Sequence, residues 1–542
     1  MNAKESLKSV EIPQNNVLEL TFTAKEEVNT PQKIKLIVQV VRSNGIQVDV
    51  PGFWAGKNTW RARFASPDVG SYEYTTSCTS TSESDEISSL QDQTGSFKVK
   101  PYTGSNKLYK HGRLRAGQGS KHLKHVDGTP FFWLGDTWWM GFTNRLHWPD
   151  EFALLTKDRV DKGFTLIQII AGLYPDMPPF DTRGANEAGF PWDKDFKEIN
   201  PAYFDMVDRR VQHLVEAGLV PCIVGFWGYF ISVAGVEALK EHWRYLVARY
   251  GAYPVVWCIA GEAMMPYYLD RHDRKTWKKE ERPRRLAAWS EVTAHVKSID
   301  SFHNPVTIHP TRYGHEQLDN PGLLDIDMLQ TGHANAAREI STIKNTVKMI
   351  RTSTKQDIPV VVGEVCYEGI LEANRQEVQR CLFWANILSG GAGHTYGANG
   401  IWQLNRRDQP FGPSPHGASW GETPWEDAYQ LLGSEHVGAG KKILCEFPWW
   451  ELEPHPEWVK GRNVYAAGIP GELRIIYHYL PGNITIKGIE KDVEYKATWI
   501  DPKDGTRYPI GIVQQDGQGK WTTPKPNIFQ DWIMVLKRRK EG

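Results

Sequence analysis

Two glutamates that each end a short apolar stretch are the residues best suited to chemistry in this sequence. Residues 255–262 read VVWCIAGE and end in Glu262, and residues 359–364 read PVVVGE and end in Glu364. Runs rich in β-branched residues are typical of the buried strands of a parallel sheet, whose carboxyl ends open into a cleft. Two carboxyl groups at such strand ends predict acid–base chemistry on a glycosidic bond.

These two glutamates can divide the work of a retaining glycosidase. One carboxylic acid protonates the leaving oxygen and one carboxylate attacks the anomeric carbon, with the two groups about 5 to 5.5 Å apart. Burial beside a second carboxylate is the usual means of holding one proton near neutrality. We therefore interpret Glu262 as the acid/base and Glu364 as the nucleophile. The alternative is an ion pair at a strand end; Glu368, the first substitute nucleophile, is better interpreted as part of a loop.

Polar and aromatic side chains near the ends of the other predicted strands suggest a sugar-binding rim. Sugar sites combine aromatic faces, which stack on the apolar faces of the rings, with a few directed polar groups. We predict substrate contacts for Asp136, Trp138, Trp139, Gln168, Trp227, His309, His333, Tyr396, Trp402 and Gln403. For any one of them, we give equal weight to the alternative that it is a core residue whose side-chain hydrogen bonds are made within the protein.

A metal site is a second alternative for part of this rim. Asp136 could bind a metal together with His309 or His333, but the close ligand spacing of a known metal motif is missing. No glycine-rich phosphate loop precedes a helix, and no Gly-x-Ser-x-Gly elbow occurs. We predict no metal and no cofactor.

Alternating strands and helices must position these residues. Apolar strand candidates lie at residues 131–136, 164–171, 219–226, 255–262, 305–309, 328–333, 359–364 and 394–402. Amphipathic helices separate several of them, most clearly over 203–216. Eight such units between residues 106 and 440 predict an α/β fold, a (β/α)8 TIM barrel, whose active site lies at the carboxyl ends of the strands.

Strand-rich segments flank the predicted barrel. Residues 1–105 and 441–542 contain alternating or apolar runs separated by turn residues, which predicts an N-terminal and a C-terminal β-sandwich. Trp54, Trp60 and Trp499 lie in strand-like segments of these sandwiches. We predict that they are structural, because a large ring in a strand is more easily buried than displayed.

Composition argues against nucleic acid and membranes and favours a neutral or locally recognised partner, for which we predict a carbohydrate. Lys plus Arg and Asp plus Glu both total 64, so no overall field favours nucleic acid or an anionic membrane. The 22 tryptophans suit sugar rings, and the six cysteines show no disulfide framework. Residues 1–6 lack the apolar core of a secretory signal, which favours a cytoplasmic location, or a periplasmic or secreted one if a signal has been removed. The oligomeric state is open.

Several segments resemble one family of barrel enzymes. Residues 128–139, GTPFFWLGDTWW, resemble the opening strand of the apiosidase-like glycoside hydrolases, and residues 52–64 resemble the sandwich that often precedes such barrels. The eighth-strand region resembles the family at residues 394–397 and 401–403, and the C-terminal sandwich at 480–482 and 499–502. The name given to that C-terminal sandwich refers to collagen binding. We do not infer a collagen-binding function from the name.

The resemblance implies a retaining glycosidase with Glu262 as the fourth-strand acid/base and Glu364 as the seventh-strand nucleophile. In many members of the wider clan, Asn precedes the acid/base and contacts the sugar 2-hydroxyl; here Gly261 takes that place, so another group must supply the contact. We expect a glycoside hydrolase that acts on a plant or microbial polysaccharide or oligosaccharide. The alternatives are a non-catalytic carbohydrate-binding protein on a barrel scaffold and a metal-dependent barrel hydrolase.

Overall fold

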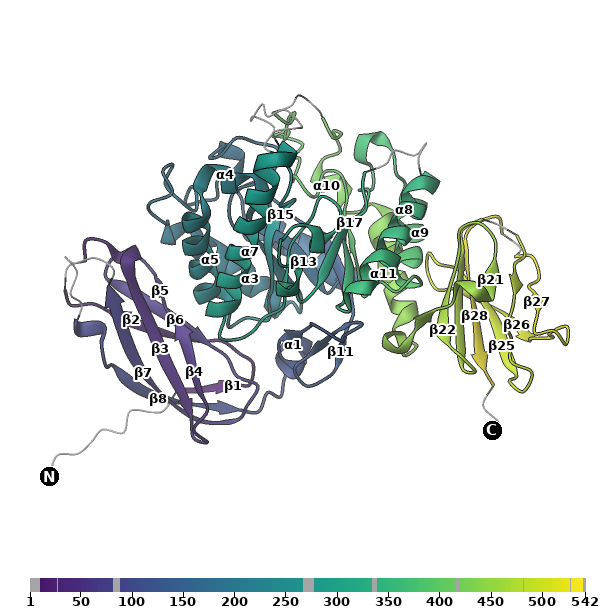
Figure 1. Cartoon of the computed structure of the whole chain (residues 1–542), viewed down its shortest axis with the longest axis horizontal. Helices are drawn as coiled ribbons and strands as arrows, with labels where there is room; N and C mark the ends of the chain where they lie inside the picture. Colours follow the sequence, from purple (N-terminus) through teal and green to yellow (C-terminus); the bar gives the residue numbers. More distant parts are fainter. Residues whose placement is uncertain are drawn as a thin grey trace.

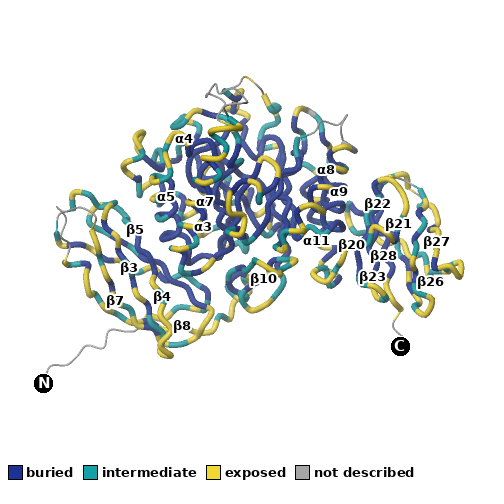
Figure 2. The backbone as a smooth tube through the Cα atoms, viewed as in Figure 1, coloured by how far each residue is buried: buried dark blue, intermediate teal, exposed yellow. Residues whose placement is uncertain are grey.

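A computed structural model shows a central barrel with one group of sheets before it and another after it along the chain (Figure 1). It describes residues 10–26, 28–80, 88–266, 277–333, 339–415, 417, 419–480, 482–526 and 528–539. The N-terminal residues that bear on cellular location, and Pro481 of the C-terminal resemblance, lie outside this set. Buried residues are concentrated in the barrel, and the outlying strands carry more exposed positions (Figure 2).

Eight parallel strands form the barrel, which confirms the predicted fold class. They are β12 (Trp133–Thr137), β13 (Leu166–Ile170), β14 (Val220–Trp227), β15 (Val256–Gly261), β16 (Val306–Thr307), β17 (Asp327–Gln330), β18 (Val360–Glu364) and β19 (Gly393–Tyr396). They pair in the order β16-β15-β14-β13-β12-β19-β18-β17. The carbonyl of Val306 accepts hydrogen bonds from the amides of Asp325 and Ile326, at 2.9 and 3.3 Å, and so links the two ends of the sheet.

The first and last barrel strands have other bounds than predicted. The last barrel strand stops at Tyr396, because the following residues 399–404 form turns and Gly400 has a positive φ of 93°. The first begins at Trp133 rather than Phe131. Phe131 instead belongs to β11 (Pro130–Phe131), which pairs antiparallel with β10 (Leu123–His125) and, through it, with β9 (Leu114–Arg115). This small sheet precedes the barrel along the chain.

Helices cover the outside of the barrel. The main ones are α2 (Asp150–Lys162), α3 (Pro201–Glu216), α5 (Val236–Tyr250), α7 (Arg282–Ile299), α8 (Glu339–Ser353), α9 (Gln376–Ile387) and α11 (Leu432–Leu444), with short helices α1 (Lys107–His111), α4 (Ile231–Ala234) and α10 (Trp425–Ala428). Helix α3 illustrates why the sequence forms a helix at this place. Asn200 caps its first turn by accepting a hydrogen bond from the amide of Ala202, and Pro201 occupies the first position. Its buried stripe packs on the barrel.

The N-terminal region is a β-sandwich. One sheet has the order β1-β8-β7-β3-β4 and the other β2-β6-β5. Their strands are β1 (Val10–Pro13), β2 (Leu18–Thr23), β3 (Ile34–Arg42), β4 (Gln47–Pro51), β5 (Phe53–Trp54), β6 (Thr59–Phe64), β7 (Gly70–Ser80) and β8 (Thr94–Lys100). Alternate residues of β3, namely Leu36, Val38 and Val40, point into the core with Trp60.

The C-terminal region also has two sheets, in the orders β20-β22-β23-β28-β25-β26 and β21-β24-β27. The strands are β20 (Glu453–Pro454), β21 (Val459–Lys460), β22 (Val464–Ile469), β23 (Leu473–His478), β24 (Thr485–Ile486), β25 (Tyr495–Ile500), β26 (Arg507–Ile512), β27 (Trp521–Thr522) and β28 (Trp532–Arg538). A buried ion pair ties them to the barrel: Arg380 of α9 donates to both oxygens of Asp531, at 2.7 and 3.0 Å.

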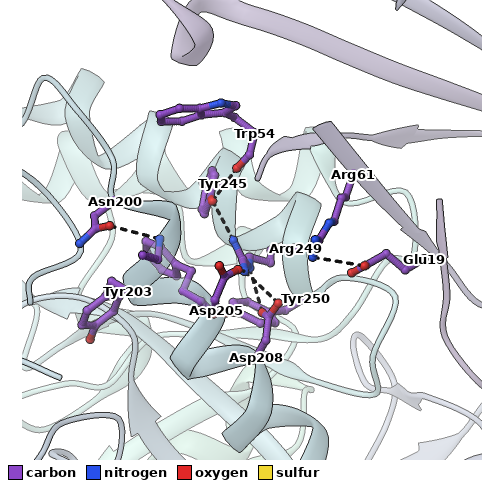
Figure 3. Close-up of polar contacts among 12 residues, drawn as sticks. Glu19, Trp54, Arg61, Asn200, Tyr203, Asp205, Asp208, Tyr245, Arg249 and Tyr250 are labelled. Carbon is purple, nitrogen blue, oxygen red and sulfur yellow. Dashed lines mark hydrogen bonds and ion pairs between the residues drawn. The ribbon is translucent and has the colours of Figure 1, made fainter. Parts of the chain in front are cut away.

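A second buried ionic cluster joins the N-terminal sandwich to the barrel. Arg249 of α5 donates to both carboxylate oxygens of Asp208 in α3, at 2.8 and 2.9 Å (Figure 3). Arg63 of β6 donates to Asp208 and, at 2.8 Å, to the carbonyl of Arg249. The neighbouring hydroxyl of Tyr245 donates to the carbonyl of Trp54 at 2.8 Å. These contacts fix the position of the sandwich against α3 and α5.

The three sandwich tryptophans differ in exposure. Trp60 and Trp499 are buried as predicted, whereas Trp54 is only partly buried and lies beside helix α5. Trp54 nevertheless packs against the cores of both the sandwich and the barrel, as expected of a structural residue, and keeps part of its surface exposed. Among the described residues, no helix combines the length and apolar character needed to cross a membrane.

Candidate active site

The predicted pair of glutamates lies at the carboxyl end of the barrel. Glu262 directly follows β15, Glu364 ends β18, and Gln330 ends β17, which pairs with β18. The side-chain amide of Gln330 donates to Oε1 of Glu262 at 2.9 Å and to Oε1 of Glu364 at 2.7 Å. Since one nitrogen reaches both atoms, the two Oε1 atoms lie no farther apart than these bonds allow, about 5.6 Å.

Both carboxyl groups face one aromatic pocket. The cavity has a volume of about 130 Å³ and is lined by Trp139, Pro175, Asp176, Trp227, Glu262, Met265, His333, Glu364, Tyr367, Ile370, Trp402 and Trp420. Indole and phenol rings provide flat apolar walls, and the carboxyl groups provide the polar floor. A cavity of this kind suits a ring that has apolar faces and hydroxyl edges.

Glu364 is surrounded by hydrogen-bond donors. His333 Nε2 lies 2.7 Å from its Oε1, and the hydroxyl of Tyr367 donates to its Oε2 at 2.6 Å. His309 Nε2 lies 3.3 Å from Oε2, at ion-pair distance but without the alignment of a hydrogen bond. Burial alone would raise the pKa of Glu364, but the two imidazoles outweigh it and hold that pKa well below its ordinary value. Glu364 is therefore ionised at neutral pH.

The pKa of Glu262 is displaced in the opposite direction. Removal from solvent, and then the charge of Glu364, raise the pKa of Glu262 to about 7. Its backbone also has a φ of 39°, in the left-handed region that non-glycine residues rarely adopt. Such conformations concentrate at functional sites, where the surrounding structure holds them. At neutral pH this side chain can keep a proton, and it can also release one.

Gly261, immediately before Glu262, makes room for an aromatic wall. A Cβ atom at this position would lie 2.1 Å from a ring carbon of Trp227. The indole of Trp227 therefore fills the space beside Gly261, and a larger residue at position 261 would displace this wall of the pocket.

The structure brings five of the predicted rim residues to this pocket. Trp139, Trp227, His333 and Trp402 line it. His309 lies behind them, buried, against Glu364 and the rings of Trp139 and Trp227. The structure therefore groups these five residues around the two glutamates, and their contact with a sugar stays a prediction.

Five other predicted residues lie away from the pocket lining. Asp136 is fully buried, accepts a 2.5 Å hydrogen bond from Arg159 Nε, and accepts another from the indole of Trp138 at 2.8 Å. Gln168 donates to the carbonyl of Gly363, and Tyr396 donates to Glu368. Gln403 is buried and is not a lining residue. Asp136, Trp138 and Tyr396 direct their polar atoms to partners within the protein, and Gln168 does so through its amide nitrogen. The geometry therefore does not support sugar contact at these positions.

The carboxylate of Glu368 also has its partners outside the pocket lining. It accepts hydrogen bonds from the Tyr396 hydroxyl at 2.6 Å and from the backbone amide of Gly433, at the start of α11, at 2.9 Å. Burial raises the pKa of Glu368 to about 7. It is not among the residues that line the pocket, which agrees with its interpretation as part of a loop.

Sequence reasoning missed Gln330 and Tyr367, which hold the two carboxylates, and Asp176 and Trp420 in the wall. Gln330 and Tyr367 had a usable signal, because both lie within three residues of a predicted strand end. Asp176 and Trp420 lie in long loops and had none. In the described part of the chain, no three His, Cys, Asp or Glu side chains are grouped as metal ligands would be.

Solved structures share this architecture. One titled only as a glycoside hydrolase is 23% identical, covers 80% of this chain and 98% of its own, and has a TM-score of 0.65. A family 5 glycoside hydrolase from Bacteroides vulgatus is 22% identical over 79% of this chain and 94% of its own, with a TM-score of 0.65. A candidate glycoside hydrolase from the same species covers 98% of this chain and 100% of its own at 18% identity and a TM-score of 0.70.

Fold, pocket and relatives together define a glycoside hydrolase built on a TIM barrel. The model of the apiosidase-like catalytic domain matches residues 117–451, more than half of the chain. The chain belongs to this family. Residues 11–79 match a domain of unknown function, and residues 463–537 match a domain described as a candidate collagen-binding domain of a collagenase. No curated protein sequence matches the chain.

Proposed function

We propose that this chain is a retaining glycoside hydrolase that acts by double displacement on a plant or microbial polysaccharide or oligosaccharide. One observation carries the proposal: two carboxyl groups in one pocket, bridged by Gln330, have pKa values displaced in opposite directions. A protonated acid and an ionised nucleophile, about 5 to 5.5 Å apart, are what this mechanism requires.

The two steps use the same pair of groups. In the first, the Glu364 carboxylate attacks the anomeric carbon while Glu262 gives its proton to the leaving oxygen, which leaves a glycosyl ester on Glu364. In the second, ionised Glu262 takes a proton from water, the water oxygen attacks the anomeric carbon, and the ester bond breaks. Two inversions return the original anomeric configuration.

The surrounding residues support each step. Tyr367 and His333 orient Glu364 through their hydrogen bonds to different oxygens. The walls formed by Trp139, Trp227 and Trp402 can stack on the sugar and exclude water around it. Glu262 protonates the leaving oxygen as the glycosidic bond breaks. Substrates with poor leaving groups should therefore depend on Glu262 most.

Azide rescue tests the two roles. With an aryl glycoside, Glu364→Ala should lose turnover and recover it with azide as the nucleophile, giving a glycosyl azide of inverted configuration. Glu262→Ala should still cleave a glycoside with a good leaving group and should give the retained azide. Glu368→Ala is the matched control. Its rate of hydrolysis per folded molecule should equal that of the unsubstituted enzyme. Inverted product from the unsubstituted enzyme, followed by NMR, rules out the proposal.

A further inference from the structure

A second cavity lies on the flank of the barrel, outside the candidate active site. It has a volume of about 640 Å³ and is shared by the N-terminal sandwich and helix α5. From the sandwich it receives Trp54 and Lys35; from the barrel it receives Phe196, Glu241 and Tyr245. We call it the flank groove. The active-site cavity, at about 130 Å³, is much smaller.

We propose that the flank groove is a second carbohydrate site, which binds a neutral oligosaccharide segment of the substrate polymer. The proposal rests on the proposed function in one respect, namely that the chain acts on a polymeric carbohydrate. The groove supplies binding and contains none of the groups assigned to catalysis.

Aromatic rings provide the first reason. Trp54 of the sandwich and Phe196 of the loop before α3 are both partly exposed, and both line the groove. Rings that are left partly open at a cavity wall can stack on the apolar faces of sugars. Trp192, also in the wall, is almost fully buried and holds its indole nitrogen against His242 at 3.1 Å.

The position of Trp54 is fixed before any ligand arrives. Its indole nitrogen donates to the carbonyl of Lys57 at 2.7 Å, and its own carbonyl accepts from the hydroxyl of Tyr245 at 2.8 Å. Figure 3 shows Trp54 above Tyr245, with Arg249 and Asp208 beneath. This ionic cluster holds the sandwich and helix together, so little ordering cost remains for binding.

The charges of the groove favour a neutral ligand rich in hydroxyl groups. Its wall contains four cationic and three anionic side chains: Lys33, Lys35, Lys197 and Arg244, and Glu198, Glu237 and Glu241. Arg244 and Glu241 pair with each other at 3.1 Å. A nearly balanced set offers both donors and acceptors to hydroxyls, and it does not produce the strong positive field that nucleic acid or an anionic polymer requires.

Adjacent residues of strand β14 contact the groove and the active-site pocket. Phe226 and Trp227 are consecutive residues of β14, and their side chains point to opposite sides of the strand. Trp227 lines the active-site pocket, whereas Phe226 contacts Phe196 of the groove with ring centroids 6.4 Å apart. A polymer held along the flank would therefore lie close to the edge of the pocket that cleaves it.

Binding can be measured without turnover in a Glu364→Gln background. Affinity electrophoresis and calorimetry would use soluble arabinan, galactan, xylan and β-glucan as probes. We expect at least one polymer to bind, and Trp54→Ala to weaken that binding about tenfold, the effect of losing one well-placed aromatic contact. Trp450→Ala removes an exposed tryptophan elsewhere and is the control. In the active enzyme, Trp54→Ala should raise KM for the polymer and leave kcat/KM for a small aryl glycoside unchanged.

A second variant covers the case in which Trp54→Ala loosens the sandwich. Ala238→Arg on α5 places a bulky side chain in the groove while leaving every described contact of Trp54 in place, and it should weaken polymer binding to a similar extent. Equal polymer affinity for the parent, Trp54→Ala and Ala238→Arg overturns the proposal, as does the absence of binding to all four polymers. Because binding is measured without hydrolysis, a lack of catalysis in the active-site pocket can be distinguished from a lack of binding in the flank groove.

Discussion

Glu262 and Glu364 accept hydrogen bonds from the same nitrogen of Gln330, yet the pKa values of their carboxyl groups are displaced in opposite directions. The environment of each group explains the difference. Glu262 is removed from solvent and faces a negative charge, whereas Glu364 is surrounded by two imidazoles and a phenol. Each group is thus held in the protonation state that the first step of the proposed double displacement uses.

This difference predicts the pH dependence of the reaction. The active form carries a proton on Glu262, whose raised pKa is about 7, and none on Glu364, whose pKa is lowered. Raising the pH through about 7 removes the Glu262 proton, so kcat/KM should fall on the alkaline side, while the acidic limb should lie at low pH. Glu262→Gln, assayed with an activated aryl glycoside, should lose the alkaline limb. An unchanged limb in that variant would assign it to another group.

Tyr367→Phe should impair catalysis without unfolding the protein. The hydroxyl donates to Glu364 Oε2 at 2.6 Å, and a hydrogen bond to a charged group contributes about 1.5 to 3 kcal/mol. We expect kcat/KM to fall about 10- to 100-fold and the acidic limb to move to higher pH, since the carboxylate loses a stabilising donor. Tyr396→Phe is the control, because its hydroxyl serves Glu368 away from the pocket. A larger activity loss in the control than in Tyr367→Phe contradicts this assignment.

Gln330→Leu tests the shared amide. Its hydrogen bond lowers the pKa of Glu262 against the larger effect of burial, so its removal should raise that pKa further. The alkaline limb of the kcat/KM profile should therefore move to higher pH, and kcat/KM should also fall, about 10- to 100-fold, because both carboxyl groups lose a donor. A limb that moves to lower pH would show that Gln330 does not stabilise the ionised form of Glu262.

Asp136→Ala should affect stability more than activity. Asp136 and Arg159 are both fully buried and paired, so removal of the carboxylate leaves the guanidinium with Asp158 as its remaining carboxylate partner and should cost about 3 kcal/mol. A lower thermal midpoint with near-normal kcat per folded molecule is the expected result. The double variant Asp136→Leu with Arg159→Met removes both charges and should recover part of the midpoint. A normally stable Asp136→Ala enzyme with a large loss of kcat would return Asp136 to the active site.

Much of the barrel, and the strand ends on which the two glutamates lie, were predictable from the sequence alone. Eight apolar runs separated by helical stretches predict the parallel barrel, because each run must be covered on both faces. The same pattern places Glu262 and Glu364 at strand ends that share one mouth. The aromatic rim at Trp139, Trp227 and Trp402 follows from the same reasoning.

Only the tertiary structure decided which polar groups face the pocket and which face inward. Asp136 looks like a rim residue until Arg159, 23 residues later in helix α2, is seen to reach its carboxylate. Gln330 gains its importance from two glutamates on different strands, and Trp54 gains its groove from a helix almost two hundred residues away. The local sequence determines where strands run, since burial follows periodicity; the direction and partner of a polar side chain depend on segments that only folding brings together.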